Sequence, residues 1–191
     1  MKYETAITQV ESEISRFVDV LRRENVKSFL EIGSRFGGSL WRIANALPVG
    51  SRIVSCDSGK GMGGKKPGAT ESLKMCIARL NEIGYDAHLV VGDSQLPEQI
   101  DAVRKLGPFD AVFIDGDHEL VGVTRDWKNY GKMSRIVGFH DVGWIKPVVY
   151  NDSKVVRVPE LWDSLKTKYR HEEFIDYSTG STMGIGVLWT R

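Results

Sequence analysis

The sequence has little cysteine, almost no excess charge and no long apolar run, and each shortage excludes a class of protein. Its two cysteines do not form a Cys-x-x-Cys pair, so neither a zinc ribbon nor a dithiol redox motif is expected. Lys and Arg number 26 against 25 Asp and Glu, which argues against a protein that coats nucleic acid. Because no apolar run approaches the roughly 18 residues that span a bilayer, we expect a cytoplasmic protein with no membrane partner.

What the sequence does contain is a regular alternation of short apolar runs with helically spaced apolar residues. Hydrophobic residues make up 41% of the 191 positions, enough for one folded domain. Such alternation predicts crossover units in a doubly wound α/β fold, a parallel sheet with helices on both faces. The predicted strands are residues 26–32, 52–56, 87–91, 109–114, 134–139, 173–177 and 185–189. The predicted helices surround 7–21, 40–47, 73–83, 95–106, 120–130 and 158–169.

Acidic residues follow most of the predicted strands. In doubly wound sheets, ligands bind beyond the carboxyl ends of the strands, where strand order reverses. Four of the first five strands reach a carboxylate within two residues of their ends, at Asp57, Asp93, Asp115 and Asp141. A carboxylate needs water or a partner, and a cleft at this edge supplies both.

The turn after the first strand, Glu31-Ile-Gly-Ser-Arg-Phe-Gly-Gly-Ser39, is rich in glycine. Such a turn lets backbone N–H groups face an anionic ligand. A dinucleotide fingerprint requires glycine where Arg35 stands, so a smaller nucleoside that carries a carboxylate fits better than a pyrophosphate. The alternative is that Gly37 and Gly38 only allow the helix to pack closely on the strand.

Asp57 lies 24 residues after Gly33, at the tip of the second strand. An acid in this place can accept hydrogen bonds from ribose hydroxyls. The alternative is that Asp57 caps the turn at Ser58-Gly59. The glycine turn and the acid together favour nucleoside binding.

These motifs, with Gly92-Asp93-Ser94-Gln95 and Phe113-Ile114-Asp115, resemble the class I S-adenosylmethionine-dependent methyltransferases. The resemblance is strongest to the catechol O-methyltransferase-like group and the related macrocin-type and cephalosporin-hydroxylase-like proteins. It covers about Val26–Val142 and implies a Rossmann-like, seven-stranded, mostly parallel sheet with an antiparallel last strand. It also implies one methyltransferase domain over 1–191, with an N-terminal helix in 1–24, a cofactor-binding core in 25–142, and a C-terminal helix and hairpin in 143–191.

The resemblance also assigns cofactor-binding residues. In the family, the glycine turn and the residue matching Ser39 hold the methionine portion of S-adenosyl-L-methionine, the residue matching Asp57 holds the ribose, and the loop matching Asp93-Ser94 lies on the adenine. The full set expected at the cofactor is Glu31, Gly33, Ser34, Arg35, Ser39, Asp57, Ser58, Asp93, Ser94 and Asp115.

A second group of residues, Asp115, His140 and Asp141, follows the fourth and fifth strands. These strands are neighbours in the predicted topology, so the three side chains can converge. The catechol-type relatives bind a divalent metal at the matching positions, although they usually carry a carboxylate at His140 and an amide at Asp141. Oxygen ligands favour Mg²⁺, and the imidazole also admits Mn²⁺ or another transition metal. The alternative is that Asp141 caps a loop and His140 packs at a strand end.

His118 stands where the catechol-type relatives have a lysine that takes the hydroxyl proton, and histidine can act as a base near neutral pH. We therefore expect His118 and Asp115 to be catalytic. The alternative is that His118 is solvated in the first turn of the helix, with Asp117 as its N-cap. The loop 59–68, with Lys60, Lys65 and Lys66, is expected to be solvated, although it could also draw in an anionic substrate.

These residues together predict an S-adenosylmethionine-dependent O-methyltransferase that acts on a hydroxyl of a small molecule, sugar-containing or phenolic, with assistance from a divalent metal. Two alternatives stay open, a metal-independent methyltransferase with His118 as base and a nucleoside-binding relative without catalysis. No nucleic-acid partner is expected. The oligomeric state is open, a homo-oligomer included.

Overall fold

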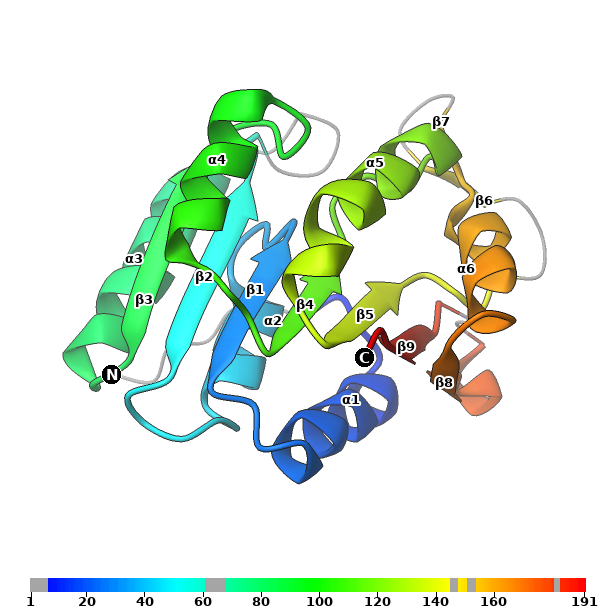
Figure 1. The fold of residues 1–191 in the computed structure, drawn as a ribbon, viewed down its shortest axis with the longest axis horizontal. Helices are drawn as coiled ribbons and strands as arrows, with labels where there is room; N and C mark the ends of the chain where they lie inside the picture. Colours follow the sequence, from blue (N-terminus) through cyan, green and yellow to red (C-terminus); the bar gives the residue numbers. More distant parts are fainter. Residues whose placement is uncertain (1–6, 61–67, 145–147, 151–153, 181–182) are drawn as a thin grey trace.

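A seven-stranded sheet forms the centre of the protein (Figure 1). The structure, a computed structural model, describes residues 7–60, 68–144, 148–150, 154–180 and 183–191. The strand order is β3-β2-β1-β4-β5-β9-β8, and β9 runs antiparallel to both of its neighbours while the other pairings are parallel, which confirms the predicted fold class. The strands are β1 (Ser28–Ile32), β2 (Arg52–Asp57), β3 (Asp86–Val91), β4 (Ala111–Ile114), β5 (Ile136–His140), β8 (Arg170–Phe174) and β9 (Ile185–Trp189).

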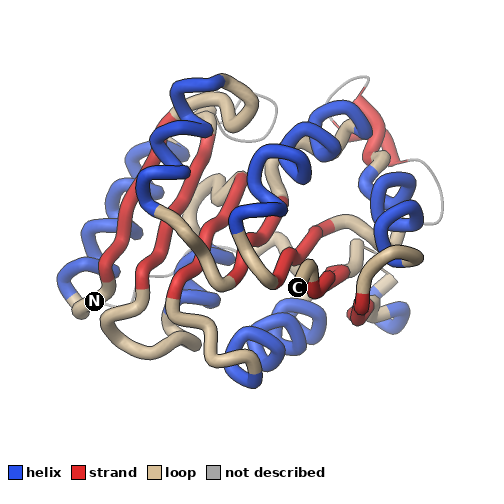
Figure 2. Tube along the Cα trace, viewed as in Figure 1, coloured by secondary structure: helices blue, strands red, loops and turns tan. Residues whose placement is uncertain are grey.

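Helices cover both faces of this sheet, as Figure 2 shows. One apolar core joins the sheet to α1 (Glu11–Arg23), α2 (Gly38–Ala44) and α3 (Ala69–Glu82). The core on the other face joins it to α4 (Pro97–Leu106), α5 (Leu120–Tyr130) and α6 (Val158–Lys166). In the described part of the chain, no helix has the length and apolarity needed to cross a bilayer.

Some boundaries differ from the sequence prediction. The strand expected at 173–177 is β8, Arg170–Phe174, and a short hairpin of β6 (Val148–Tyr150) and β7 (Lys154–Val156) was not expected. The end of the loop expected at 59–68 agrees with the structure, in which α3 begins at Ala69. Lys65 and Lys66 lie outside the described residues.

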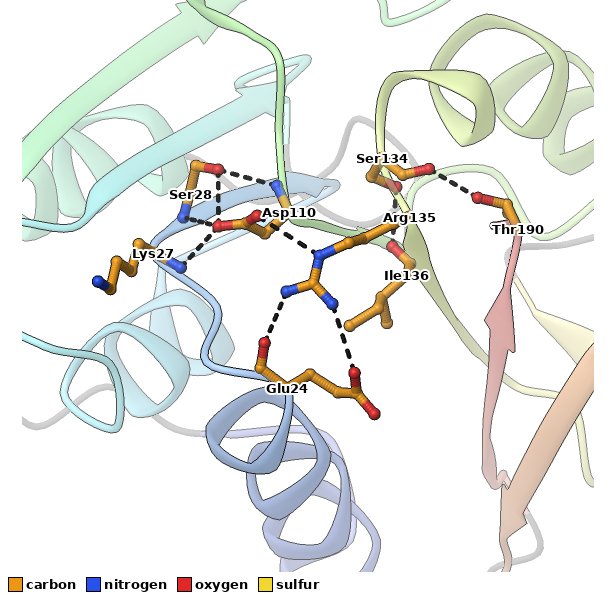
Figure 3. Close-up of polar contacts among 8 residues, drawn as sticks. All are labelled: Glu24, Lys27, Ser28, Asp110, Ser134, Arg135, Ile136 and Thr190. Carbon is orange, nitrogen blue, oxygen red and sulfur yellow. Dashed lines mark hydrogen bonds and ion pairs between the residues drawn. The ribbon is translucent and has the colours of Figure 1, made fainter.

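A polar network ties the amino ends of the central strands together (Figure 3). The Asp110 carboxylate accepts hydrogen bonds from the backbone N–H groups of Lys27 and Ser28, at 2.8 and 3.1 Å, and from the Ser28 hydroxyl at 3.1 Å. Arg135 approaches Asp110 at 3.6 Å and donates to the Glu24 carbonyl oxygen at 2.6 Å. The network therefore fixes the start of β1 against β4 and β5, at the edge opposite the expected ligands.

The strand register aligns the carboxyl ends of the strands. Ile32 of β1 pairs with Cys56 of β2 on one side and with Ile114 of β4 on the other. From β1 the chain winds outward to β2 and β3, and from β4 it winds the opposite way to β5. The reversal of strand order therefore falls between β1 and β4, which is where doubly wound sheets bind ligands.

Candidate active site

A cleft of about 1010 Å³ opens at this reversal point. It is bounded by the loops after β1, β2, β3, β4 and β5, by Thr8 and Gln9 ahead of α1, and by Met183 ahead of β9. The predicted site residues that line it are Gly33, Ser34, Arg35, Ser39, Asp57, Ser58, Asp93, Ser94, Asp115, His118, His140 and Asp141.

Glu31 is the predicted cofactor residue that the cleft does not reach. Glu31 lies in β1 and is 0% exposed, and the hydroxyls of Ser34 and Ser39 act on its carboxyl group. Burial raises the pKa of Glu31 to about 8, against the weaker opposing influence of those two hydroxyls. The structure therefore does not support a direct contact between Glu31 and a cofactor. The carboxyl group of Glu31 instead lies next to side chains of the glycine turn, which lines the cleft.

The glycine turn passes extremely close to the loop after β4. Gly33 has a φ of 87°, and a Cβ there would lie 2.5 Å from the Cα of Gly116 and closer still to the carbonyl oxygen of Asp115. Only glycine combines this conformation with such an approach. Gly37 has a φ of 90° and packs on Cys76 of α3, so it allows a close approach between the turn and a neighbouring helix, a different contact from the helix-on-strand packing of the alternative interpretation.

Both carboxylate oxygens of Asp57 accept hydrogen bonds from backbone N–H groups, one in the glycine turn and one in the loop after β2. Oδ2 accepts a hydrogen bond from the Arg35 N–H, and Oδ1 accepts one from the Gly59 N–H, each at 2.7 Å. The turn-capping interpretation of Asp57 is therefore realised. Each oxygen has a second lone pair, so the ribose-binding role stays a prediction. Arg35 itself has a φ of 51°, a conformation that persists in non-glycine residues mainly where the surroundings enforce it.

Asp115, His140 and Asp141 converge at the other end of the cleft. One potential ligand atom from each lies within 4.8 Å of the others. His140 Nδ1 is 3.0 Å from Asp115 Oδ1 and 3.6 Å from Asp141 Oδ2. In an octahedron with metal–oxygen bonds of about 2.1 Å, adjacent ligand atoms lie about 3 Å apart. The spacing and the donor types therefore fit a divalent cation.

Two neutral donors orient these carboxylates from outside. Gln9 Nε2 donates to Asp115 Oδ2 at 2.6 Å, and Trp144 Nε1 donates to Asp141 Oδ1 at 2.8 Å. Each carboxylate thus has its outer oxygen held, while its inner oxygen faces His140. Donors of this kind around metal ligands fix their orientation.

The same convergence changes the charge state of the group. Burial would lower the pKa of His140, but the charges of Asp115 and Asp141 outweigh it and raise that pKa well above the usual value. Burial would raise the pKa of Asp141, but the charge of His140 and the hydrogen bond from His118 bring it to about 2. The negative charges of Asp115 and Asp141 can therefore be balanced either by a protonated His140 or by a bound metal ion.

His118 lies beside this group. Its Nδ1 is 2.6 Å from Asp141 Oδ2, and its side chain keeps 20% of its surface exposed. Burial lowers the pKa of His118, but the hydrogen bond and charge of Asp141 more than compensate and leave it raised. The alternative interpretation placed the N-cap two residues too early: α5 has Glu119 at its N-cap, and Asp117 instead accepts a hydrogen bond from the Glu119 N–H at 2.9 Å.

At the opposite end, Asp93 and Ser94 form the loop after β3. Asp93 Oδ1 accepts a hydrogen bond from the Gln95 N–H at 2.9 Å. The Ser94 hydroxyl donates to Asp126 Oδ1 at 2.7 Å, and the Ser94 carbonyl oxygen accepts from the Tyr130 hydroxyl at 2.6 Å. Asp126 and Tyr130 of α5 therefore fix the position of this loop through hydrogen bonds to Ser94.

Sequence reasoning missed Gln9 and Asp126. Gln9 lies 106 residues from its partner Asp115, and no local pattern marks it. Asp126 had a visible signal: it falls at helical spacing between Val123 and Tyr130, on the face of α5 that is buried. A charged residue at a core position of a helix indicates a buried polar partner, because such residues are seldom buried alone.

Comparison with known proteins gives a family and a fold. The family model described as a methyltransferase domain matches residues 30–142. No curated protein matches the chain. Among solved structures, the chain is similar to the O-methyltransferase TomG from Streptomyces achromogenes, involved in tomaymycin synthesis and solved with SAM. The identity is 20%, with 96% of this chain and 82% of TomG covered and a TM-score of 0.71.

Two further solved structures share the fold. Cofactor-bound Rv0187 from MTB is 18% identical over 99% of this chain and 84% of its own, with a TM-score of 0.72. An O-methyltransferase from Bacillus cereus in complex with SAH is 16% identical over 97% of this chain and 84% of its own, with a TM-score of 0.66.

Proposed function

Because the chain belongs to the methyltransferase domain family, we propose that it transfers a methyl group from S-adenosyl-L-methionine to a hydroxyl of a small molecule, with a divalent metal at Asp115, His140 and Asp141. The observation that carries the proposal is that one cleft is lined both by Asp57 and Ser94, where the nucleoside of the donor would lie, and by the group of acids and histidines, where an acceptor oxygen would bind. Methyl transfer needs both in one place, because donor and acceptor must be aligned for in-line attack.

The donor would lie along the loops after β1, β2 and β3. The turn at Gly33–Ser39 faces the methionine portion, Asp57 and Ser58 the ribose, and Asp93 and Ser94 the adenine. Support comes from the cleft-lining positions of these residues, and from the similar structures solved with SAM and SAH. Glu31 would act only through the turn above it.

A divalent cation would be held by Asp115, His140 and Asp141, with Mg²⁺ or Mn²⁺ fitting two carboxylates and one imidazole. When bound, such an ion lowers the pKa of a hydroxyl that it contacts. Gln9 and Trp144 keep the two carboxylates turned toward the shared point. Asp115 would contact both ligands. Its side chain is one of the three proposed metal ligands, and its backbone packs against Gly33 in the turn that would bind the donor.

His118 would take the proton of the acceptor hydroxyl. With Asp141 ionised, the His118 Nδ1–H donates to Asp141 Oδ2, which places the lone pair of the imidazole on Nε2. Asp141 is in turn held by Trp144, so the ring has a fixed orientation and a fixed tautomer. A base within reach of a hydroxyl proton contributes roughly 10²- to 10⁴-fold in rate.

A metal-independent version of this reaction has support from one observation. The raised pKa of His140 leaves a positive charge between Asp115 and Asp141, where the metal would otherwise be. That charge could stabilise a developing oxyanion while His118 acts as the base. A nucleoside-binding relative without catalysis is a further alternative, because a fold by itself does not establish an activity.

Calorimetric titration tests the donor and the metal together. The protein is titrated with S-adenosyl-L-methionine and S-adenosyl-L-homocysteine, each with Mg²⁺ and with a chelator. We expect both to bind, and methyl transfer to a panel of phenols and sugar hydroxyls, detected as released S-adenosyl-L-homocysteine, to depend on the metal. Transfer that survives exhaustive chelation selects the metal-independent version. Binding without transfer to any hydroxyl favours the non-catalytic relative.

The role of His118 has its own test. His118→Ala should lower turnover at least 100-fold, because a general base contributes about this much. The affinity for S-adenosyl-L-homocysteine should stay within a few-fold, since His118 lies at the acceptor end. Unchanged turnover would remove His118 from the mechanism.

A further inference from the structure

A carboxyl group that the proposed reaction does not use lies behind the nucleoside end of the cleft. Asp126 of α5 is 0% exposed, and its Oδ1 accepts a hydrogen bond from the Ser94 hydroxyl at 2.7 Å. Ser94 lines the cleft. A ligand at this end would therefore meet a hydroxyl group whose other contact is a buried acid.

A second contact fixes the backbone of the same residue. The Tyr130 hydroxyl, one helical turn after Asp126, donates to the Ser94 carbonyl oxygen at 2.6 Å. Ser94 thus has two anchors on α5. The Tyr130 contact fixes where Ser94 lies, whereas the Asp126 contact also decides which way the Ser94 hydroxyl points its hydrogen.

The surroundings of Asp126 favour its neutral form. Asp117 faces it from the loop after β4, Asp93 from the loop after β3, Cys56 from the end of β2, and Tyr130 from α5 itself. Burial, reinforced by the charges of Asp117 and Asp93, outweighs its hydrogen bond and raises the pKa of Asp126 to about 7. A neutral carboxyl is therefore well populated at neutral pH.

The position of the proton follows from the two oxygens. Oδ2 is sealed from solvent, lies beside Gly116, and has no hydrogen-bond partner among the described residues. A proton on Oδ2 would be a buried donor without an acceptor, whereas Oδ1 lies 2.7 Å from the Ser94 hydroxyl oxygen, so the proton belongs on Oδ1. There it can donate to the Ser94 hydroxyl oxygen. The Ser94 hydrogen is then free to turn toward the cleft, since a hydroxyl has one donor and two acceptor positions.

We propose that Asp126 is a proton-holding positioning residue, which is neutral when the cleft is occupied and makes the Ser94 hydroxyl a hydrogen-bond donor to the bound base. This inference rests on the proposed function, because it places an adenine beside Ser94. Two effects of the ligand favour the neutral acid: the ring nitrogens of adenine are acceptors, and a base over Ser94 excludes water from the loop. Binding should therefore take up a proton from solvent.

S-Adenosyl-L-homocysteine is the probe, because it has the nucleoside and cannot donate a methyl group. Its binding is measured by calorimetry between pH 6 and pH 8, at each pH in two buffers of different ionisation enthalpy, which gives the number of protons taken up. Uptake of one proton limits the change in affinity to about tenfold per pH unit. We expect the affinity of the wild-type protein to fall about threefold to tenfold from pH 6 to pH 8.

Three variants separate the roles of the contacts. Asp126→Asn keeps the volume but cannot change charge, and Ser94→Ala keeps the acid but removes the hydroxyl; both should lose the proton uptake and flatten the pH dependence. Tyr130→Phe is the matched control, because it removes the anchor that does not set the direction of the hydroxyl. It should weaken binding by a similar factor at every pH and retain the proton uptake.

Equal pH dependence and equal proton uptake in the wild-type protein, Asp126→Asn and Ser94→Ala would overturn the inference. If Asp126→Asn does not fold, the comparison of Ser94→Ala with Tyr130→Phe decides in the same way. A wild-type protein that binds neither S-adenosyl-L-methionine nor S-adenosyl-L-homocysteine at any pH is a different result, and it would overturn the proposed function as well.

Discussion

The contact between the glycine turn and the loop after β4 makes Gly33 the most sensitive glycine of the cleft. Gly33→Ala puts a methyl group 2.5 Å from the Cα of Gly116 and still nearer to the Asp115 carbonyl oxygen. Both neighbours are backbone atoms, so the substitution can be accommodated only if one loop moves. Because Asp115 contacts His140 in the group proposed to hold the metal, that movement should also disturb this group.

Gly50→Ala gives a matched control for the backbone conformation. Gly50 has the same φ of 87°, but a Cβ there meets nothing within 4 Å. The left-handed conformation costs a non-glycine residue roughly 1–2 kcal/mol, and the lower entropy of the unfolded chain offsets about 0.4–1 kcal/mol of it. Gly50→Ala should therefore destabilise the protein by about 1 kcal/mol.

Gly33→Ala adds the clash to the same conformational cost. Overpacking of a filled interior costs roughly 1–3 kcal/mol, so the total should be about 3 kcal/mol. For a chain of this length, 1 kcal/mol corresponds to roughly 2–4 °C in Tm. We expect Gly33→Ala to lower Tm by about 6–12 °C and Gly50→Ala by about 2–4 °C. Thermal unfolding followed by circular dichroism measures both, and equal losses would refute the role assigned to the contact.

Two further predictions concern a buried acid and the metal group. The folded-state pKa of Glu31 is raised from 4.5 to about 8, so between these values the folded protein holds a proton that the unfolded chain releases, and stability should fall as pH rises through this window. In denaturant unfolding at pH 5 and pH 8, Glu31→Gln should show a smaller fall than the wild-type protein, with Asp126 supplying part of what remains; a fall of equal size in the variant would assign the whole effect to other groups. Gln9→Leu, which removes the donor to Asp115, should weaken Mn²⁺ binding roughly 10- to 100-fold in a paramagnetic-resonance titration. Thr8→Val, beside it on the cleft wall, should not, and equal affinities in the two variants would show that Gln9 does not support the metal ligands.

The sequence was sufficient to predict the sheet because its apolar runs are short and buried on both faces. All four residues of β4 and all five residues of β5 are buried, as continuous apolar segments of this length are expected to be. The predicted bounds were wrong for β8, the strand at the edge of the sheet. β8, Arg-His-Glu-Glu-Phe, buries only its last residue well, so the apolar residues after it misled the assignment toward 173–177.

The candidate site was predictable to the extent that strand ends determine it. Asp57, Asp115 and His140 follow or end strands, and the parallel register brings them to one edge. The contacts that orient them come from elsewhere in the chain. Gln9 reaches Asp115 from ahead of α1, and Trp144 reaches Asp141 from the loop after β5. Such contacts depend on how whole elements pack, and short-range patterns do not contain this information.

The placement of the chain ends decides how the protein should be handled at the bench. Thr8 and Gln9 form part of the cleft wall, so a purification tag or fluorophore fused ahead of them would sit beside the entrance for ligands. β9 runs the other way: its last residue, Trp189, pairs with Ile136 at the start of β5, and Arg191 is exposed there. Tags, spin labels and surface attachment therefore belong at the carboxyl end, which lies at the edge of the sheet opposite the ligand cleft.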